Sequence, residues 1–338
     1  MKFTIGFEKE DTKRLHECWD EIIVNQQWSE GKYTKLFEEK WSVYNQLESV
    51  AFSSWGGAAL AVLEFFNVRG RVVLCPSNTF MATPLSVVKA GGLVEFVDCN
   101  RDDLCLSLED LEKKIREYKP VAVWLVHIGG HIAFQVNEIS ELCRKNKVVL
   151  FEDCAHAHGA SWDGKKAGTW GDVGIYSFYA TKTISTGEGG MLVTANKELA
   201  EFARRYRNYG KFEYKVEGLN YRMNEFTAAI GCVQADRLND IVGWKNEFAK
   251  KHLDPKFSAR LKFPKGMVSG YYKYIVFEPI EKSTGRVYDQ PCHKIMGRGY
   301  DLPNTEWVAN NHWCVPLYYK GEDVENPALS SVERRVGI

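Results

Sequence analysis

The sequence has no excess of charge of either sign and no long apolar run. Its 338 residues carry 44 Lys and Arg against 44 Asp and Glu, so the formal net charge is zero. A balanced chain offers no electrostatic attraction for nucleic acid or for an anionic membrane surface. The longest apolar stretch, around AALAVLEFF, is about half the length that a membrane-spanning helix needs. We therefore expect neither nucleic acid nor a membrane as a partner.

Several short motifs are also absent. The chain has nine Cys and eight His but no CxxC and no HExxH, so we expect reduced cysteines and no metal site. The lack of a GxGxxG fingerprint after the first strand argues against a Rossmann-type oxidoreductase. The opening residues, MKFTIGFEKEDTKRLHE, are charged at once and lack the apolar core of a signal peptide. These absences favour a cytoplasmic protein.

What is present is a regular alternation of apolar runs and helical patterns. The runs RVVLCP, LVEFVD, VAVWLVHIGG and VVLFEDCAH are apolar throughout, as strands buried on both faces are. Segments of 10–14 residues with helical spacing separate them, and residues 9–25 and 34–46 have the same spacing. This pattern predicts an α/β fold with a mostly parallel sheet, helices on both faces, and ligands at the carboxyl ends of the strands.

The pattern changes after residue 195. Residues 196–208 and 223–253 have helical spacing, and short strand-like pieces such as YYKYIVFE follow, with one further helix candidate at 291–299. We predict a large α/β domain over residues 1–245 and a small α+β domain over residues 246–338. The boundary between them is expected between residues 240 and 260.

Two loops carry groups suited to an anion and to an aldehyde. FSSWGGAAL opens a helix, where Gly56 and Gly57 let an anion approach the backbone N–H groups. In SFYATKTISTGEGGM, Ser177 ends a strand and Lys182 follows five residues later. A serine hydroxyl binds a phosphate oxygen, and a lysine amine forms an imine with an aldehyde. Each feature alone has a plain structural reading, because glycine is common at helix starts and most loop lysines are simply solvated.

Two further loops add a ring and a carboxylate. In CPSNTFMAT, Phe80 follows a strand and either packs in the core or stacks on a flat cofactor. In FEDCAHAHGA, Glu152 and Asp153 end a buried strand, and only one of two neighbours faces the site. Asp153 is the better candidate, although the sequence leaves the choice of face open. Together the four loops supply the groups that pyridoxal 5'-phosphate requires.

The chain resembles the DegT-type nucleotide-sugar aminotransferases, which are fold-type I pyridoxal phosphate enzymes. The resemblance is carried by WSEGKYTKLFEEKW, CPSNTFMAT, FEDCAHAHGA, GDVGIYSFYATKTISTGEGGM and GLNYRMNEFTAAIGCVQADRLN, and it weakens into YDLPNTEWVANNHWCVPLYY. It implies the fold-type I architecture, with a mostly parallel central sheet and a smaller C-terminal α+β domain. Relatives commonly have Asn-Gly-Thr where this chain has Trp55-Gly56-Gly57, so phosphate binding is expected to depend more on backbone N–H groups and on Ser177.

The resemblance also implies a role for each matching residue. Lys182 and Asp153 are the implied catalytic pair: Lys182 bonds to the cofactor and moves protons, and Asp153 partners the pyridinium nitrogen. The implied contacts to the cofactor are His156 near its phenolic oxygen, Phe80 on its ring, and Ser177, Gly56 and Gly57 on its phosphate. Asn220 matches an asparagine that reaches the cofactor phosphate of a neighbouring subunit. We therefore expect a homodimer with shared active sites.

The implied reaction moves an amino group from glutamate to a keto sugar attached to a nucleotide. The run TKTISTGEGGM resembles the C4-aminating members, including the GDP-perosamine synthase type, which favours a 4-keto-6-deoxy sugar as acceptor. The expected product is an amino sugar for polysaccharide or glycan biosynthesis. Lys182 argues against the sugar 3-dehydrating branch, which carries His there. Two alternatives stay open, namely C3 amination and a catalytically silent relative that binds the cofactor as a regulator.

Overall fold

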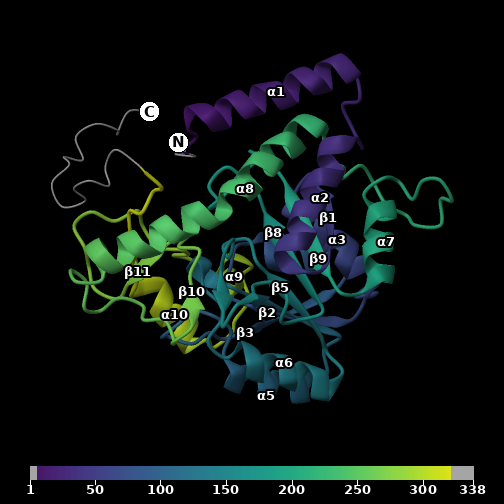
Figure 1. Cartoon of the computed structure of the whole chain (residues 1–338). Coiled ribbons are helices and arrows are strands. Elements are labelled where there is room, and N and C mark those ends of the chain that lie inside the picture. Colours follow the sequence, from purple (N-terminus) through teal and green to yellow (C-terminus); the bar gives the residue numbers. More distant parts are fainter. Residues whose placement is uncertain (1–5, 321–338) are drawn as a thin grey trace.

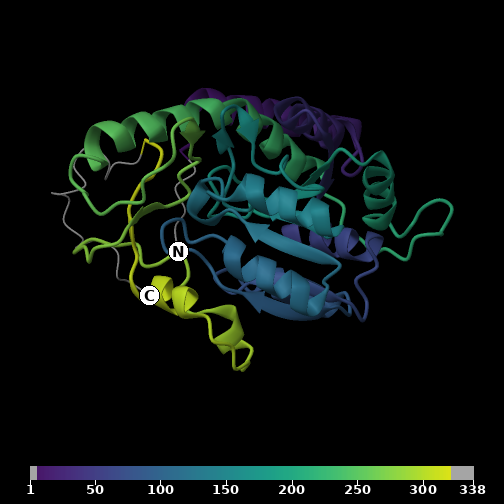
Figure 2. The ribbon, with the colours of Figure 1, turned by 90° about the horizontal axis from the view of Figure 1, so that it is seen from below.

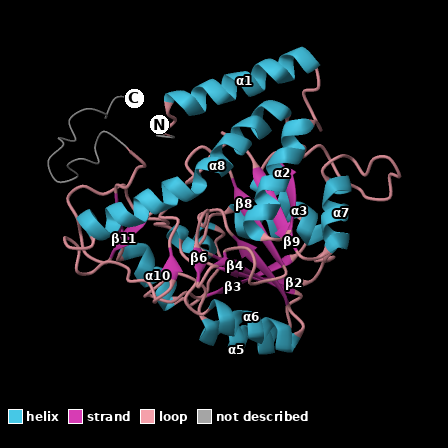
Figure 3. Cartoon of the chain, in the orientation of Figure 1, coloured by secondary structure: helices cyan, strands magenta, loops and turns pink. Residues whose placement is uncertain are grey.

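The computed structural model describes residues 6–320, and a seven-stranded sheet lies at its centre (Figure 3). The strand order is β1-β9-β8-β5-β4-β2-β3. Only β9 runs against its neighbours, β1 and β8, and all other pairs are parallel, so the expected mostly parallel α/β fold is confirmed. The strands are β1 (Glu48–Phe52), β2 (Val72–Pro76), β3 (Leu93–Val97), β4 (Ala122–Val126), β5 (Val149–Asp153), β8 (Val173–Ser177) and β9 (Gly190–Thr194).

Helices cover both faces of this sheet (Figure 1). One face packs against α1 (Lys9–Asn25), α2 (Lys32–Asn45), α5 (Leu108–Tyr118), α6 (Val136–Asn146) and α8 (Glu225–Phe248). The other packs against α3 (Trp55–Phe65), α4 (Ala82–Lys89) and α7 (Lys197–Tyr206). The strands are apolar throughout because their alternate residues enter two different cores. In β4, for example, Val123 and Leu125 join the first core, whereas Trp124 joins the second.

The segment after α8 forms a smaller layer beside the large sheet (Figure 2). Its elements, together with the short ones inserted earlier in the chain, are η1 (Ile128–Gly130), η2 (Ala249–Leu253), β6 (Ser161–Trp162), β7 (Lys165–Lys166), β10 (Met267–Val268), β11 (Tyr274–Val276), β12 (Trp313–Val315), α9 (Cys292–Ile295) and α10 (Pro303–Asn310). Strand β11 pairs with β12, and β10 pairs with β6. Helix α8 is continuous through residue 245, and residues 321–338 lie outside the described part. The division into domains 1–245 and 246–338 therefore stays a prediction.

Side-chain caps fix where several helices begin. Ser107, expected as a cap, accepts the N–H of Asp110 at the start of α5. Asn224 does the same for Thr227 at the start of α8, and Ser54 for Gly57 at the start of α3. The start of α3 is therefore fixed directly beside the carboxyl ends of the strands. Among residues 6–320, no helix combines the length and the hydropathy needed to cross a membrane.

Candidate active site

A cavity of about 750 Å³ opens at the carboxyl ends of the central strands. It collects six of the eight residues predicted from the sequence, and they come from four separate loops. These six are Gly56, Phe80, Asp153, His156, Ser177 and Lys182. Gly57 and Asn220 do not line the cavity. The arrangement follows from the topology, since the strands that end in these loops are parallel neighbours or next neighbours in the sheet.

Lys182 lies in the loop that follows β8, with its backbone N–H bonded to the carbonyl of Tyr179 at 2.9 Å. Its Nζ is 4.8 Å from the centroid of the Tyr272 ring. The pKa of Lys182 is lowered to about 8, chiefly by burial; attraction to Asp153 opposes this shift, and repulsion from Lys273 adds to it. A substantial fraction of this amine is therefore neutral near pH 8. A neutral amine is the form that attacks a carbonyl carbon and accepts a proton.

The Asp153 carboxylate faces the same cavity and is almost fully buried. Its Oδ1 accepts the N–H of Ala155 at 3.0 Å, and its Oδ2 accepts the hydroxyl of Thr83 at 3.1 Å. Burial raises the pKa of Asp153, while the Ala155 N–H, the charge of Lys182 and the Thr83 hydroxyl lower it. Each oxygen retains acceptor capacity, so the carboxylate has room for a further cationic donor.

Glu152 turns to the opposite side of β5 and holds a loop together. Its two oxygens accept backbone N–H groups of residues 168, 170 and 171 at 2.6–2.8 Å. The ring of His127 lies beside it, with Nε2 2.8 Å from Oε2. His127 Nδ1 accepts the N–H of Ala133, so Nε2 is the nitrogen that donates. The question that the sequence left open is thus answered in favour of Asp153 as the residue that faces the cavity.

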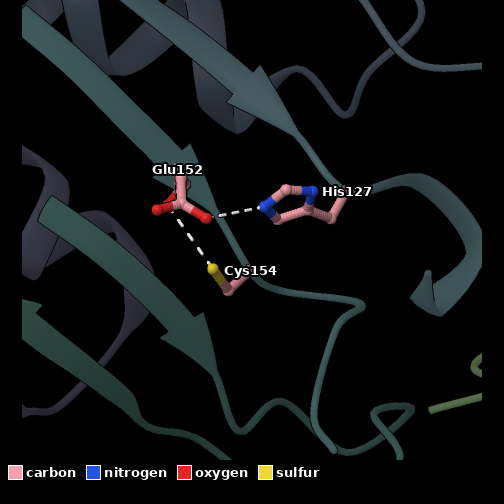
Figure 4. Close-up of side chains that lie close together, drawn as sticks. All are labelled: His127, Glu152 and Cys154. Atoms are coloured by element: carbon pink, nitrogen blue, oxygen red, sulfur yellow. Dashed lines mark hydrogen bonds and ion pairs between the residues drawn. The ribbon is translucent and has the colours of Figure 1, made fainter. Parts of the chain in front are cut away.

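Cys154 completes a close group with Glu152 and His127 (Figure 4). The ligand atoms of the three residues lie within 4.8 Å of one another, a spacing that a metal ion would also need. Both Glu152 oxygens, however, already accept backbone N–H groups, and burial raises the pKa of the Cys154 thiol well above its usual value. A neutral thiol, and a carboxylate whose oxygens already accept hydrogen bonds, are poor metal ligands. The group is a structural hydrogen-bond network.

His156 is enclosed by two tyrosines that the sequence motifs did not predict. Its ring stacks on Tyr272 with centroids 4.1 Å apart, and the Tyr288 hydroxyl lies 3.3 Å from its Nε2. Burial lowers the pKa of His156 well below its usual value, so the ring is neutral. Both tyrosines line the cavity, but they come from the segment after α8, where no short motif marks them.

Phe80 is exposed at the cavity mouth, with 63% of its surface accessible. This exposure excludes the core-packing reading of Phe80 in the single chain and leaves its ring face available for stacking. Trp55 is also among the residues that line the cavity, but it packs into the core against Trp124, with ring centroids 5.3 Å apart. The bulky residue that replaces the asparagine of relatives therefore does not fill the cavity.

Ser177 and the start of α3 form a part of the cavity that is suited to an anion. Ser177 Oγ accepts the N–H of Tyr179 at 3.3 Å, which leaves the serine proton for another acceptor. Gly56 lies in the first turn of α3, where backbone N–H groups have no partner within the helix. Gly57 instead donates its N–H to Ser54, and a Cβ at Gly57 would lie 2.9 Å from the Tyr221 ring. A threonine side chain has no room there, and the predicted role of Gly57 stays a prediction.

An arm of residues 207–222 projects beside α7 (Figures 1 and 2). Asn220 is exposed and pairs with Asn208 in an isolated β-bridge at the base of this arm. Its side-chain oxygen accepts the N–H of Arg222 at 3.3 Å. Asn220 does not reach the cavity of its own chain. Its predicted contact with a cofactor phosphate therefore requires a second subunit, and it stays a prediction.

Comparison with known proteins gives consistent matches. Residues 9–262 match the DegT/DnrJ/EryC1/StrS aminotransferase family. GDP-perosamine synthase of Escherichia coli O157:H7 is 34% identical over 251 residues, which are 72% of this chain and 67% of that protein. The chain thus spans about two thirds of the length of such synthases.

Two further relatives are each 29% identical, and their names assign the amino group to different carbons, C3 and C4. They are a dTDP-3-amino-3,4,6-trideoxy-alpha-D-glucose transaminase of Micromonospora megalomicea subsp. nigra and a dTDP-4-dehydro-2,3,6-trideoxy-D-glucose 4-aminotransferase of Saccharopolyspora spinosa. The alignments cover 85% of both chains for the first, and 87% of this chain and 86% of that protein for the second. A solved DegT DnrJ EryC1 StrS aminotransferase from Brucella abortus superposes with a TM-score of 0.88 over 97% of both chains, at 23% identity.

Proposed function

The chain belongs to the DegT/DnrJ/EryC1/StrS aminotransferase family, and from this membership we propose that it transfers an amino group from glutamate to C4 of a nucleotide-linked 4-keto-6-deoxy sugar. That it is a sugar aminotransferase with pyridoxal 5'-phosphate as cofactor agrees with the expectation from its motifs. One observation carries the proposed chemistry: Lys182, Asp153 and Ser177, from two different strand ends, line one cavity.

The residues of the cavity fit each part of the cofactor. The neutral amine of Lys182 suits its aldehyde. The carboxylate of Asp153, whose oxygens can each accept a further hydrogen bond, suits its ring nitrogen. The exposed ring of Phe80 offers a stacking surface, and Ser177 with the first turn of α3 offers donors to its phosphate. His156, being neutral, offers a ring N–H to an oxygen without adding charge. We propose these five contacts on that basis.

Bound pyridoxal phosphate makes the α-proton of an amino acid acidic by drawing electrons toward its ring. The chain's own groups do the rest. Asp153 holds the ring nitrogen in its protonated form, because a nearby negative charge raises the pKa of a cation. Lys182 would take the proton from the donor's α-carbon as a positioned base and, once protonated, would give it as an acid to the carbon that carried the cofactor's aldehyde. The Tyr272 ring, whose centroid lies 4.8 Å from Lys182 Nζ, covers one side of that amine.

The state of Lys182 predicts how fast the apoprotein captures its cofactor at different pH values. Only the neutral amine attacks the aldehyde, and the pKa of Lys182 is about 8. The second-order rate of capture should therefore rise about tenfold per pH unit below pH 8 and level off above it. Stopped-flow absorbance between pH 6 and 9.5 measures this. A rate that keeps rising toward pH 10.5 would show an unperturbed lysine and contradict the assignment.

The acceptor proposal rests on the run TKTISTGEGGM and on relatives named GDP-perosamine synthase and 4-aminotransferase. C3 amination is the second candidate, because a transaminase named for a 3-amino sugar is 29% identical to this chain, the same identity as the 4-aminotransferase. The test incubates the holoenzyme and glutamate with dTDP-, UDP- and GDP-linked 3-keto and 4-keto sugars, and identifies amino sugars by mass and NMR. Products from 3-keto sugars alone would overturn C4 amination, and turnover only with a donor other than glutamate would overturn the donor.

A homodimer is proposed from the arm of residues 207–222. The arm exposes Phe212 at 87% and Tyr214 at 68%, beside the exposed Asn220. Aromatic side chains on a projecting segment are typical of a contact with another protein. Because Asn220 is proposed to reach the partner's cofactor, a second copy of this chain is the partner that fits.

Charges on the arm should separate the subunits. We expect the wild type to sediment as a dimer and a Phe212→Asp, Tyr214→Asp double variant to sediment as a monomer, with cofactor affinity lowered at least tenfold. Val43→Asp, at an equally exposed apolar site on α2, is the matched control and should remain dimeric. Full activity in the monomeric double variant would contradict the proposed role of Asn220.

The proposed setting is the cytoplasm, with the amino sugar destined for a polysaccharide or glycan. All nine cysteines lie within the described residues and are unpaired, which suits a reducing compartment. Cell fractionation followed by immunoblotting tests this location, and recovery of the protein outside the cytoplasmic fraction would contradict it.

A further inference from the structure

The carboxylate of Asp153 receives a hydroxyl from a different part of the sheet. Thr83 lies in the first turn of α4, and its Oγ1 is 3.1 Å from Asp153 Oδ2. The two residues are 70 positions apart in the chain, and Thr83 is fully buried. The other oxygen, Oδ1, accepts the N–H of Ala155 at 3.0 Å. The carboxyl plane is thus held from both ends.

A second hydroxyl continues the chain of bonds behind Thr83. Thr79 Oγ1 lies 3.0 Å from Thr83 Oγ1, and Thr79 is also buried. An ionised Asp153 only accepts, so the single hydroxyl proton of Thr83 points to it. Thr79 must then donate to Thr83. Two hydroxyls aligned in one direction polarise each other and strengthen the final bond to the carboxylate.

Neither hydroxyl caps the start of α4, which is the usual role of a threonine near a helix start. No side chain caps the start of α4, whose cap residue is Met81. The local bond in this turn is made by Ser86, whose hydroxyl donates to the Thr83 carbonyl at 2.7 Å. Thr79 is itself anchored from the C-terminal segment, because the Cys292 thiol donates to its carbonyl at 3.0 Å. The Thr83 side chain is therefore free of its own helix and is directed at β5.

We infer that Thr83 is a positioning residue for the sugar aminotransferase, with Thr79 as its support: it fixes the plane and the charge of Asp153 against the cofactor ring nitrogen. The inference rests on the proposed role of Asp153. Without Thr83, Oδ2 loses its hydrogen-bond donor and the buried carboxylate can turn about its own bond. Its negative charge is then less favourable, and its remaining lone pairs no longer face the cavity in one orientation.

The test measures the dissociation constant of pyridoxal phosphate from apoprotein variants by absorbance titration at pH 7.5. Thr83→Val replaces the hydroxyl by a methyl group of similar size and should raise the constant about tenfold, the effect of one charge-assisted bond. Thr83→Ser restores the hydroxyl and should return it to within about twofold of the wild type. Ser86→Ala removes a buried hydroxyl of the same turn and should leave it unchanged. An unchanged constant in Thr83→Val, or no rescue by serine, overturns the inference.

A double-mutant cycle separates this inference from the proposed function. If Thr83 acts through Asp153, Thr83→Val has no further effect on affinity in an Asp153→Asn background. Full additivity would overturn the inference, and wild-type affinity in Asp153→Asn itself would overturn the proposed role of Asp153. If circular dichroism shows that Thr83→Val does not fold, the dissociation constant is measured for Thr79→Val instead. It should raise the constant about threefold, and no change there overturns the inference.

Discussion

Lys182→Ala should abolish transamination while the fold and the dimer persist. The substitution removes both the amine that bonds to the cofactor and the base that moves the donor's proton. A positioned base alone contributes about 10²–10⁴-fold, so the loss of kcat/KM should exceed about 10³-fold. Within residues 6–320, the side chain of Lys182 forms no hydrogen bond or ion pair, and its amine is costly to bury, so stability should not fall. The measurement is the glutamate half-reaction, followed by absorbance.

Lys273 provides the matched control for this variant. It lies close enough to depress the pKa of Lys182, and its Nζ is 5.2 Å from the Tyr272 ring, but it does not line the cavity. Lys273→Met should retain activity within about tenfold. Borohydride reduction of the wild-type holoenzyme, with peptide mass mapping, should find the cofactor on the peptide that contains Lys182. A label on another lysine, or normal turnover by Lys182→Ala, would contradict the assignment.

Asp153→Asn is expected to have the second largest effect. The amide is nearly the same size as the carboxylate, but it carries no charge to keep the ring nitrogen protonated. We expect kcat to fall about 10²–10³-fold, the range found when one preorganised electrostatic group is removed. The glutamate half-reaction should slow by the same factor, because removal of the α-proton depends on that charge. Single-turnover absorbance measurements follow this step directly.

The neighbouring residue offers an informative contrast. Glu152→Gln leaves the cavity unchanged but breaks a buried network that joins β5 to residues 168–171 and to His127. It should lower the free energy of unfolding by about 3–5 kcal/mol, as expected when one partner of a buried charged network is removed, with kcat nearly unchanged in the folded protein. The reverse pattern, with stability lost in Asp153→Asn and activity lost in Glu152→Gln, would mean that the two carboxylates exchange roles.

Much of the cavity could be predicted because short motifs follow the strands. Lys182, Asp153, Ser177 and Phe80 each lie within a few residues of a buried apolar run, and parallel strands bring such positions to one edge. The face of Asp153 could not be predicted, since alternation fixes only that Glu152 points the other way. The side chain of Glu152 is located by the hydrogen bonds that it accepts from the N–H groups of residues 168, 170 and 171.

Other features were not predictable because their causes are distant in the chain. Tyr272 and Tyr288 reach His156 from a segment more than 100 residues later, and no local pattern marks them. The direction of β9 also has no local signature, because an apolar run reads the same in either orientation. Gly57 matched a phosphate-binding motif, yet the ring of Tyr221 fills the space beside it. Each case depends on a tertiary neighbour.

The placement of the two tyrosines has a practical consequence for redesign. Six lining residues lie beyond residue 262, where the family match ends, namely Tyr272, Val287, Tyr288, Asp289, Gln290 and Ile295. The proposed catalytic groups all precede that point. Within residues 287–295, replacing Val287, Asp289, Gln290 and Ile295 by the matching residues of another aminotransferase should thus alter which acceptor is turned over. The half-reaction with the amino donor should be spared if Tyr288 and Cys292 are retained for their contacts with His156 and Thr79. Directed evolution of new sugar products has a compact, contiguous target in this stretch.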